Sequence, residues 1–185
     1  MGRALYRVQQ FVETFVARPT PEGLSLARQI LTPQQMMIFN RLQASEQAHA
    51  IRVLQRVEEI CQTQGFETPA DLRVAALLHD VGKARVPLRV WERVMIVLGK
   101  AILPERAARW GTQSSNGSPR GVARPFVVAA HHPAWGADFA AEQGTTPRAV
   151  SLIRRHQDQI PALDSQDQTE EDYLLAILQA VDDKS

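Results

Sequence analysis

The side chains best suited to chemistry in this sequence are a neighbouring histidine and aspartate, His79 and Asp80, at the end of an apolar run that covers residues 74–78. An imidazole nitrogen and a carboxylate oxygen can both bind one divalent cation if the chain directs them into one cavity. Lys83 follows three positions after Asp80. A buried ion pair between these two residues is the simpler alternative, because a charged aspartate beside an apolar helix must be paired or bound to metal. The metal hypothesis therefore depends on further ligands elsewhere in the chain.

Further histidines and aspartates occupy positions that helical spacing turns inward. His49 follows Leu42 by seven residues, His156 follows Leu152 by four, and Asp182 follows Leu178 by four. Taken singly, each has a simpler interpretation, as a core histidine bonded to backbone or as the solvated end of a helix. The adjacent histidines at 131 and 132 precede Pro133, which is expected to kink or restart the helix and to splay the two rings. We expect one of that pair to be a ligand.

Composition narrows the class of protein. A chain of 185 residues fits one domain with a sizeable core, and 21 basic against 20 acidic residues give a net charge of +1. That balance offers no argument for nucleic acid or an anionic membrane as a partner. The single Cys61 excludes an internal disulfide and a thiolate zinc cluster. No apolar run reaches the roughly 18 residues of a membrane span, and no leader pattern is found, so a cytoplasmic protein is expected.

Helical periodicity dominates the sequence, so we expect an all-α, single-domain helical bundle. Residues 1–32 are predicted to form a helical extension that packs on a core domain of residues 33–185. Thr32-Pro33 and Gln35 predict the start of one long helix that runs to about Thr63. Gly82 is expected to leave the next helix with positive φ. Other helices are predicted over residues 5–16, 22–31, 70–80, 90–99, 104–110 and 125–144. Two more are predicted to start near residues 146 and 169, and a polar loop is expected over 111–121.

Taken in order, these residues resemble the H…HD…H…H…D pattern of the HD-domain superfamily of metal-dependent phosphohydrolases. The resemblance covers residues 33–183 and includes HAIRV from His49, LLHDVGK over 77–83 and HPAWGA from His132. The last segment is similar to one that carries a ligand in the HD-GYP branch, which favours His132 over His131. Gln157 stands where HD-GYP domains have a second histidine, and the GYP signature is absent after it. This departure argues against hydrolysis of cyclic di-GMP.

The resemblance implies a helical bundle that holds one or two divalent or ferric cations, whether Mn, Fe, Mg, Zn or Ni. It implies a first metal held by His49, His79, Asp80 and Asp182, and a second held by His132 and His156 with Asp80 as the shared ligand. The implied reaction is hydrolysis of a phosphate ester or anhydride of a nucleotide or a related small phosphorylated metabolite, with Asp80 and Lys83 as catalytic residues.

Lys83 would contact the substrate phosphate or hold Asp80. Five arginines are candidate phosphate clamps: Arg52, Arg120, Arg124, Arg154 and Arg155. The alternative function is a non-catalytic metal- or nucleotide-binding regulatory module, which the replacement at Gln157 and the missing GYP segment favour. The sequence leaves the oligomeric state open.

Overall fold

The computed structural model of the protein describes residues 17–112, 121–160 and 169–183. Every regular element in these ranges is a helix, which confirms the all-α prediction. The helix expected over residues 5–16 and most of the polar loop expected over 111–121 lie outside the described residues. The elements are α2 (Pro21–Ile30), α3 (Pro33–Phe39), α4 (Ala44–Thr63), α5 (Ala70–Leu78), η1 (Val81–Arg85), α6 (Val90–Ile102), α7 (Pro104–Gly111), η2 (Gly121–Ala123), α8 (Arg124–Glu142), α9 (Pro147–Arg155) and α10 (Glu170–Asp182), of which η1 and η2 are 3-10 helices.

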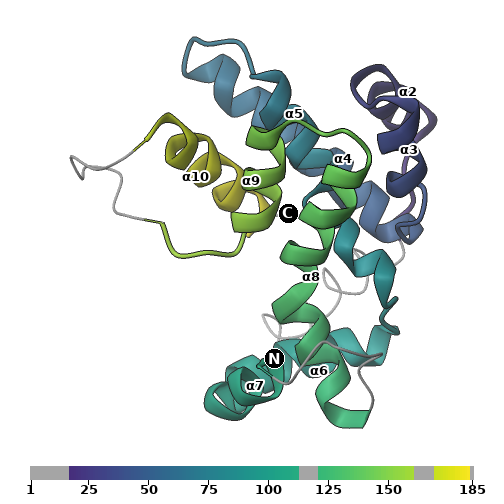
Figure 1. Cartoon of the computed structure of the whole chain (residues 1–185), viewed down its shortest axis with the longest axis vertical. Helices are drawn as coiled ribbons and strands as arrows, with labels where there is room; N and C mark the ends of the chain where they lie inside the picture. Colours follow the sequence, from purple (N-terminus) through teal and green to yellow (C-terminus); the bar gives the residue numbers. More distant parts are fainter. Residues whose placement is uncertain (1–16, 113–120, 161–168, 184–185) are drawn as a thin grey trace, which may run out of the picture.

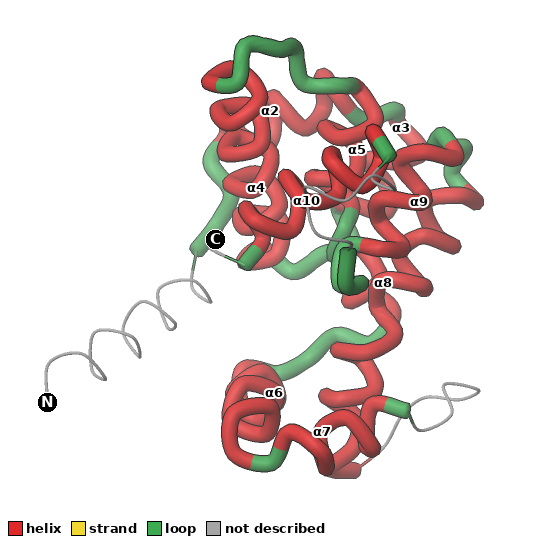
Figure 2. Tube along the Cα trace, turned by 90° about the vertical axis from the view of Figure 1, so that its left-hand side faces the viewer, coloured by secondary structure: helices red, strands yellow, loops and turns green. Residues whose placement is uncertain are grey.

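The helices form two parts that α8 joins. Figure 1 shows the upper end of α8 beside α9, with α4, α5 and α10 beyond them and α2 and α3 on the other side, while its lower end reaches α6 and α7. We call the elements around the upper end of α8 the bundle. Helices α6 and α7 pack on the other end of α8, and Figure 2 shows them set apart from the bundle. We call them the α6–α7 lobe.

Helix α5 lies at the centre of the bundle because it is apolar on nearly all of its circumference. Leu72, Leu77 and Leu78 are fully buried, in one core cluster with side chains from α2, α4, α9 and α10. Helix α2 adds Ala27 to the same cluster, while the division into an extension and a core domain at residue 32 stays a prediction. Among the described helices, none combines the length and the apolar character that crossing a membrane requires.

Local signals in the sequence set most helix ends as predicted. The Thr32 hydroxyl accepts from the backbone N–H of Gln35 at 3.2 Å, and the Gln35 side chain accepts from the N–H of Thr32 at 2.9 Å. Thr146 and Thr169 cap α9 and α10 with their hydroxyl groups. Gly144 follows α8 with φ of 72°, a conformation that favours glycine.

The long helix predicted from residue 33 to 63 is wrong in one respect, because the chain breaks it between Phe39 and Ala44. The backbone N–H of Gln43 donates to the Glu46 carboxylate at 3.0 Å, which satisfies a donor at the start of α4. Leu42 is buried between the two helices. A capping pattern inside an apparently continuous helical stretch therefore starts a second helix.

The role predicted for Gly82 is also corrected, since it lies in η1 and does not have positive φ. A Cβ atom at this position would lie 2.0 Å from the carbonyl oxygen of His132 and 2.6 Å from the backbone nitrogen of Gly136. Glycine is therefore needed because η1 packs directly on the backbone of α8. Helix α8 itself continues through Pro133 without the restart that the sequence suggested.

Candidate metal centre

The structure brings together all the side chains that the sequence analysis proposed as metal ligands. They lie on α4, on the two residues that follow α5, on α8, on the residue that follows α9 and at the last residue of α10: His49, His79, Asp80, His132, His156 and Asp182. The first half of the cluster lies around Asp182. Its Oδ1 atom is 2.8 Å from His49 Nε2 and 3.4 Å from His79 Nε2, and His79 Nε2 is also 3.5 Å from Asp80 Oδ2.

The second half of the cluster lies around the other oxygen of Asp80. Oδ1 is 3.2 Å from His132 Nε2 and 3.9 Å from His156 Nε2, and the two histidine nitrogens are 3.2 Å apart. Asp80 thus turns Oδ2 toward the first half and Oδ1 toward the second. Two groups, His49 with His79 and Asp80, and Asp80 with His132 and His156, each place their ligand atoms within 4.8 Å of one another.

Backbone carbonyls at helix ends orient two of the rings. His79 Nδ1 donates to the carbonyl of Ala76 at 2.9 Å, and His156 Nδ1 donates to that of Ile153 at 2.7 Å. Carbonyls in the last turn of a helix lack an intrahelical donor, so these bonds compete with no helical bond. With the proton on Nδ1, each neutral ring keeps a lone pair on Nε2, which is the atom that faces the cluster.

Pro133 helps to orient the third buried ring, that of His132. A proline has no N–H, so the carbonyl of Ala129, four residues earlier, lacks its helical donor. His132 Nδ1 lies 3.1 Å from that carbonyl and 3.1 Å from the carbonyl of Val128. The residue after the histidine therefore frees an acceptor that holds the ring with Nε2 toward Asp80.

The charges of the cluster are strongly coupled. Burial opposes protonation of His79, but the carboxylates of Asp80 and Asp182 outweigh it and raise the pKa of His79 to about 10. Burial also opposes ionisation of Asp80, yet Lys83 and His79 hold the pKa of its carboxyl well below the usual value. Burial, together with the positive charge of neighbouring histidines, lowers the pKa of His156 to about 3. The two carboxylates thus draw positive charge to the site, while the rings of the second half resist protonation.

A metal cation fits this arrangement. His79 Nε2 is buried and makes no hydrogen bond of normal geometry, although carboxylate oxygens of Asp182 and Asp80 lie 3.4 and 3.5 Å from it and buried polar atoms are nearly always paired. His132 and His156 turn their Nε2 lone pairs toward each other at 3.2 Å, which is unfavourable unless a positive charge lies beside them. Imidazole and carboxylate donors suit Mn, Fe, Zn and similar ions. The donor set therefore suits a cation that accepts these lone pairs.

A cavity of about 270 Å³ opens on the cluster, with His49, Asp80 and His132 in its wall. Lys83 also lines it, and Lys83 Nζ lies 2.5 Å from Asp80 Oδ2. The ion pair that the sequence offered as the alternative to a metal site is thus present, and it is part of the same cluster. The rest of the wall combines apolar side chains, such as Leu88, Ile96 and Val128, with polar ones.

One arginine in this wall was missed from the sequence. Arg93, on α6, lines the cavity, and its Nη2 atom lies 2.5 Å from Glu46 Oε1 and 3.1 Å from Gln43 Oε1. The Gln43 side chain donates in turn to the carbonyl of Leu88 at 3.2 Å. These contacts tie the lobe to the start of α4. The capping pattern of Gln43 and Glu46 was a usable signal, whereas nothing local marks Arg93.

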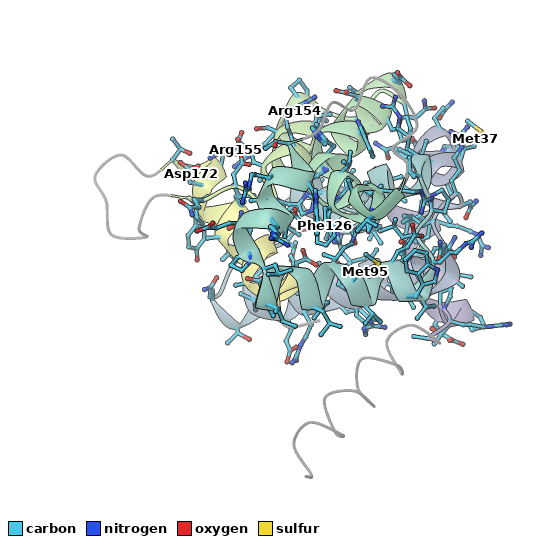
Figure 3. All side chains as sticks on the ribbon, turned by 90° about the horizontal axis from the view of Figure 1, so that it is seen from below. Met37, Met95, Phe126, Arg154, Arg155 and Asp172 are labelled. Carbon is cyan, nitrogen blue, oxygen red and sulfur yellow. The ribbon has the colours of Figure 1, made fainter. Side chains whose placement is uncertain are left out.

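The arginines proposed as phosphate clamps do not line this cavity where the structure describes them. Arg124 pairs with Glu92, and Arg154 lies 2.7 Å from Asp138. Arg155 pairs with Asp172, and Figure 3 shows these two side by side at the edge of the molecule. Arg120 lies outside the described residues.

His131 is placed apart from the cluster, in keeping with the preference for His132. Its Nε2 atom lies 3.1 Å from the carbonyl of Gly111, and its ring stacks on Trp135 with a centroid distance of 5.8 Å. Gln157 reaches the edge of the cluster, where its Nε2 atom lies 3.5 Å from His132 Nε2. The two neighbouring histidines therefore have different surroundings.

Comparison with known proteins agrees with this geometry. The model of the HD domain family matches residues 47–183, a range that contains the whole cluster. The chain belongs to the HD-domain family. This all-α family binds divalent metals and includes metal-dependent phosphohydrolases. No curated protein and no solved structure matches the chain.

Proposed function

We propose that this HD-domain protein is a metal-dependent phosphohydrolase that cleaves a phosphate ester or anhydride of a nucleotide or a related small phosphorylated metabolite. One observation carries the proposal: imidazole Nε2 atoms and two carboxylates converge in one cluster, and this cluster meets, through His49, Asp80 and His132, a cavity that Lys83 also lines. Candidate metal ligands, an ammonium group that can bind phosphate and space for a small substrate thus occur at one place.

His49, His79, Asp80 and Asp182 would hold a first cation, and Asp80 with His132 and His156 would hold a second. Bound cations supply Lewis acidity, which activates water for attack and neutralises charge on phosphoryl oxygens. The backbone bonds to Nδ1 of His79, His132 and His156 keep the rings in place, so their orientation is set before substrate binds. Asp80 orients both halves because each of its oxygens faces one of them.

Lys83 would bind the substrate phosphate. Its side chain is 30 % exposed and lines the cavity, while Asp80 holds its ammonium group beside the cluster. A phosphoryl group that enters the cavity meets this positive charge, which stabilises the negative charge on its oxygens. Arg93, in the same wall, adds a second positive group, although Glu46 neutralises it in the absence of substrate.

The test is hydrolysis by the purified protein of a panel of nucleotides and other phosphate esters and anhydrides, with Mn or Fe supplied. We expect turnover that a chelator abolishes and that Asp80→Ala removes. Activity that survived Asp80→Ala or complete removal of metal would contradict the proposal. Stable binding of metal without turnover of any compound would favour the regulatory module instead.

A further inference from the structure

A second cavity, of about 370 Å³, lies between α7 and α8 and adjoins the cavity at the metal centre. The two cavities share Ala129 and Gln157 as lining residues. Ala129 supplies a carbonyl that holds the His132 ring, and Gln157 directly follows His156. The second cavity therefore begins at the ligands of the second half of the cluster.

The walls of this second cavity are made by small and apolar groups. Ala108 on α7 and Ala130 on α8 leave space where larger side chains would fill it, and Phe126 adds an aromatic surface. Figure 3, which views the molecule from the lobe side, shows Phe126 near the centre of that face. A surface of this kind suits a flat, apolar group, because aromatic groups bury a large area against such walls.

His131 gives this cavity a polar group that the metal centre does not use. Its Nε2–H donates to the carbonyl of Gly111, so Nδ1 of the neutral ring is an acceptor. Stacking on Trp135 holds the ring plane in place. The cavity thus combines apolar walls with an imidazole ring of fixed orientation, and binding sites for small molecules generally combine apolar walls with a few polar groups.

We propose that the α7–α8 cavity binds the organic group of the substrate, a flat heteroaromatic group such as a nucleobase, while the phosphoryl group lies at the metal centre. This inference rests on the proposed function. The volume of about 370 Å³ falls within the range of about 300–1,000 Å³ typical of ligand pockets. Gln157, at the junction, would contact the part of the substrate that links the two groups.

The experiment compares two ligands that cannot be hydrolysed, a nucleoside 5′-methylenephosphonate and methylphosphonate, by titration calorimetry on the Mn-loaded protein. Nucleosides with each common base are used in turn. We expect at least one of them to bind about tenfold or more tightly than methylphosphonate, since only the nucleoside reaches the second cavity.

Ala130→Leu fills the second cavity and should lower the affinity for that nucleoside phosphonate about tenfold. The affinity for methylphosphonate should stay unchanged. Ala108→Leu fills it from the opposite helix and should act likewise, so the test does not depend on one variant. The matched control is Ala141→Leu, an exposed alanine on α8 outside the cavity, which should change neither affinity.

Two results would overturn the inference. If the nucleoside phosphonates bind no more tightly than methylphosphonate, or if both filling variants leave the ratio of the two affinities unchanged, the organic group does not lie between α7 and α8. In that case hydrolysis of phosphate esters by the wild-type protein would leave the proposed function standing. Failure of the Mn-loaded protein to bind either phosphonate would instead contradict both proposals.

Discussion

The two halves of the candidate metal centre differ in what holds their side chains. In the second half, His132 and His156 are almost completely buried, and backbone carbonyls fix both rings. In the first half, the side chains of His49 and Asp182 are 17 % and 22 % exposed and hold each other across 2.8 Å. The rings of the second half are therefore held by the backbone in the core, whereas the first half depends in part on two partly exposed side chains that hold each other directly. We expect the first half to exchange its cation more readily.

The largest effect should come from Asp80→Ala, because each of the two carboxylate oxygens of Asp80 faces one half. We expect loss of both cations and a fall in activity of about 10³-fold or more, since a bound metal supplies several kcal/mol to the transition state. Elemental analysis and the phosphohydrolase assay measure the two effects. Asp183→Ala, which removes an exposed carboxylate next to Asp182, is the control and should change neither.

The comparison between the halves is tested most directly by His49→Ala and His156→Ala. Each should reduce the metal content from two equivalents to one, and activity by about 10²-fold, because one Lewis acid is lost. A chelator should remove the remaining cation faster from His156→Ala, in which only the first half is intact. If the wild-type protein binds one equivalent and His156→Ala leaves it unchanged, the second half is no metal site.

Lys83→Met should separate phosphate binding from metal binding. We expect kcat to fall by about 10²-fold, the usual cost of removing one group that stabilises transition-state charge. The metal content should stay at the wild-type value, since the metal ligands remain. Loss of metal in this variant would show that Lys83 acts by holding Asp80, and Lys83→Arg, which keeps a cation, should recover part of the activity.

Gly82→Ala should disturb the contact between η1 and α8 that supports both halves. A Cβ atom there would lie within 3 Å of backbone atoms of His132 and Gly136, which cannot yield as a flexible side chain would. We expect the free energy of unfolding to fall by about 1–3 kcal/mol, measured by urea denaturation. Gly111→Ala is the comparison, because the nearest atom would be the Ala130 Cβ at 3.1 Å, and its effect should be smaller.

Gln179→Leu should produce the smallest effect, confined to the second half. The Gln179 side chain donates to the carbonyls of Arg155 at 3.2 Å and Asp158 at 2.9 Å, and so holds the turn that carries His156. Affinity for the second cation should fall about tenfold, as is usual when a group behind a ligand is removed. Metal titration gives both affinities. Gln55→Leu, at an exposed site on α4, is the matched control, and an equal loss in both halves would contradict the expectation.

The sequence by itself determined the helical class, most of the helix ends and the identity of the candidate ligands. The helical class and the helix ends depend on short-range rules, since a threonine cap or a glycine after a helix acts within one turn, and burial of one helix face gives a repeating pattern. The candidate ligands were identified as a set by their resemblance to the HD-domain pattern. The break between α3 and α4 was missed because the apolar pattern continues across it, although the capping pattern of Gln43 with Glu46 marks the start of the second helix.

Only the tertiary structure decided how these residues meet. It brought His49 and Asp182, 133 positions apart, to within 2.8 Å, and it selected carbonyls of Ala76 and Ile153 as partners for two rings. It also placed Arg93 in the wall of the cavity at the candidate metal centre and His131 in the wall of the α7–α8 cavity. Local spacing shows which side of its own helix a residue occupies. The neighbours that it meets there depend on how separate helices pack, and that depends on the burial of the whole core.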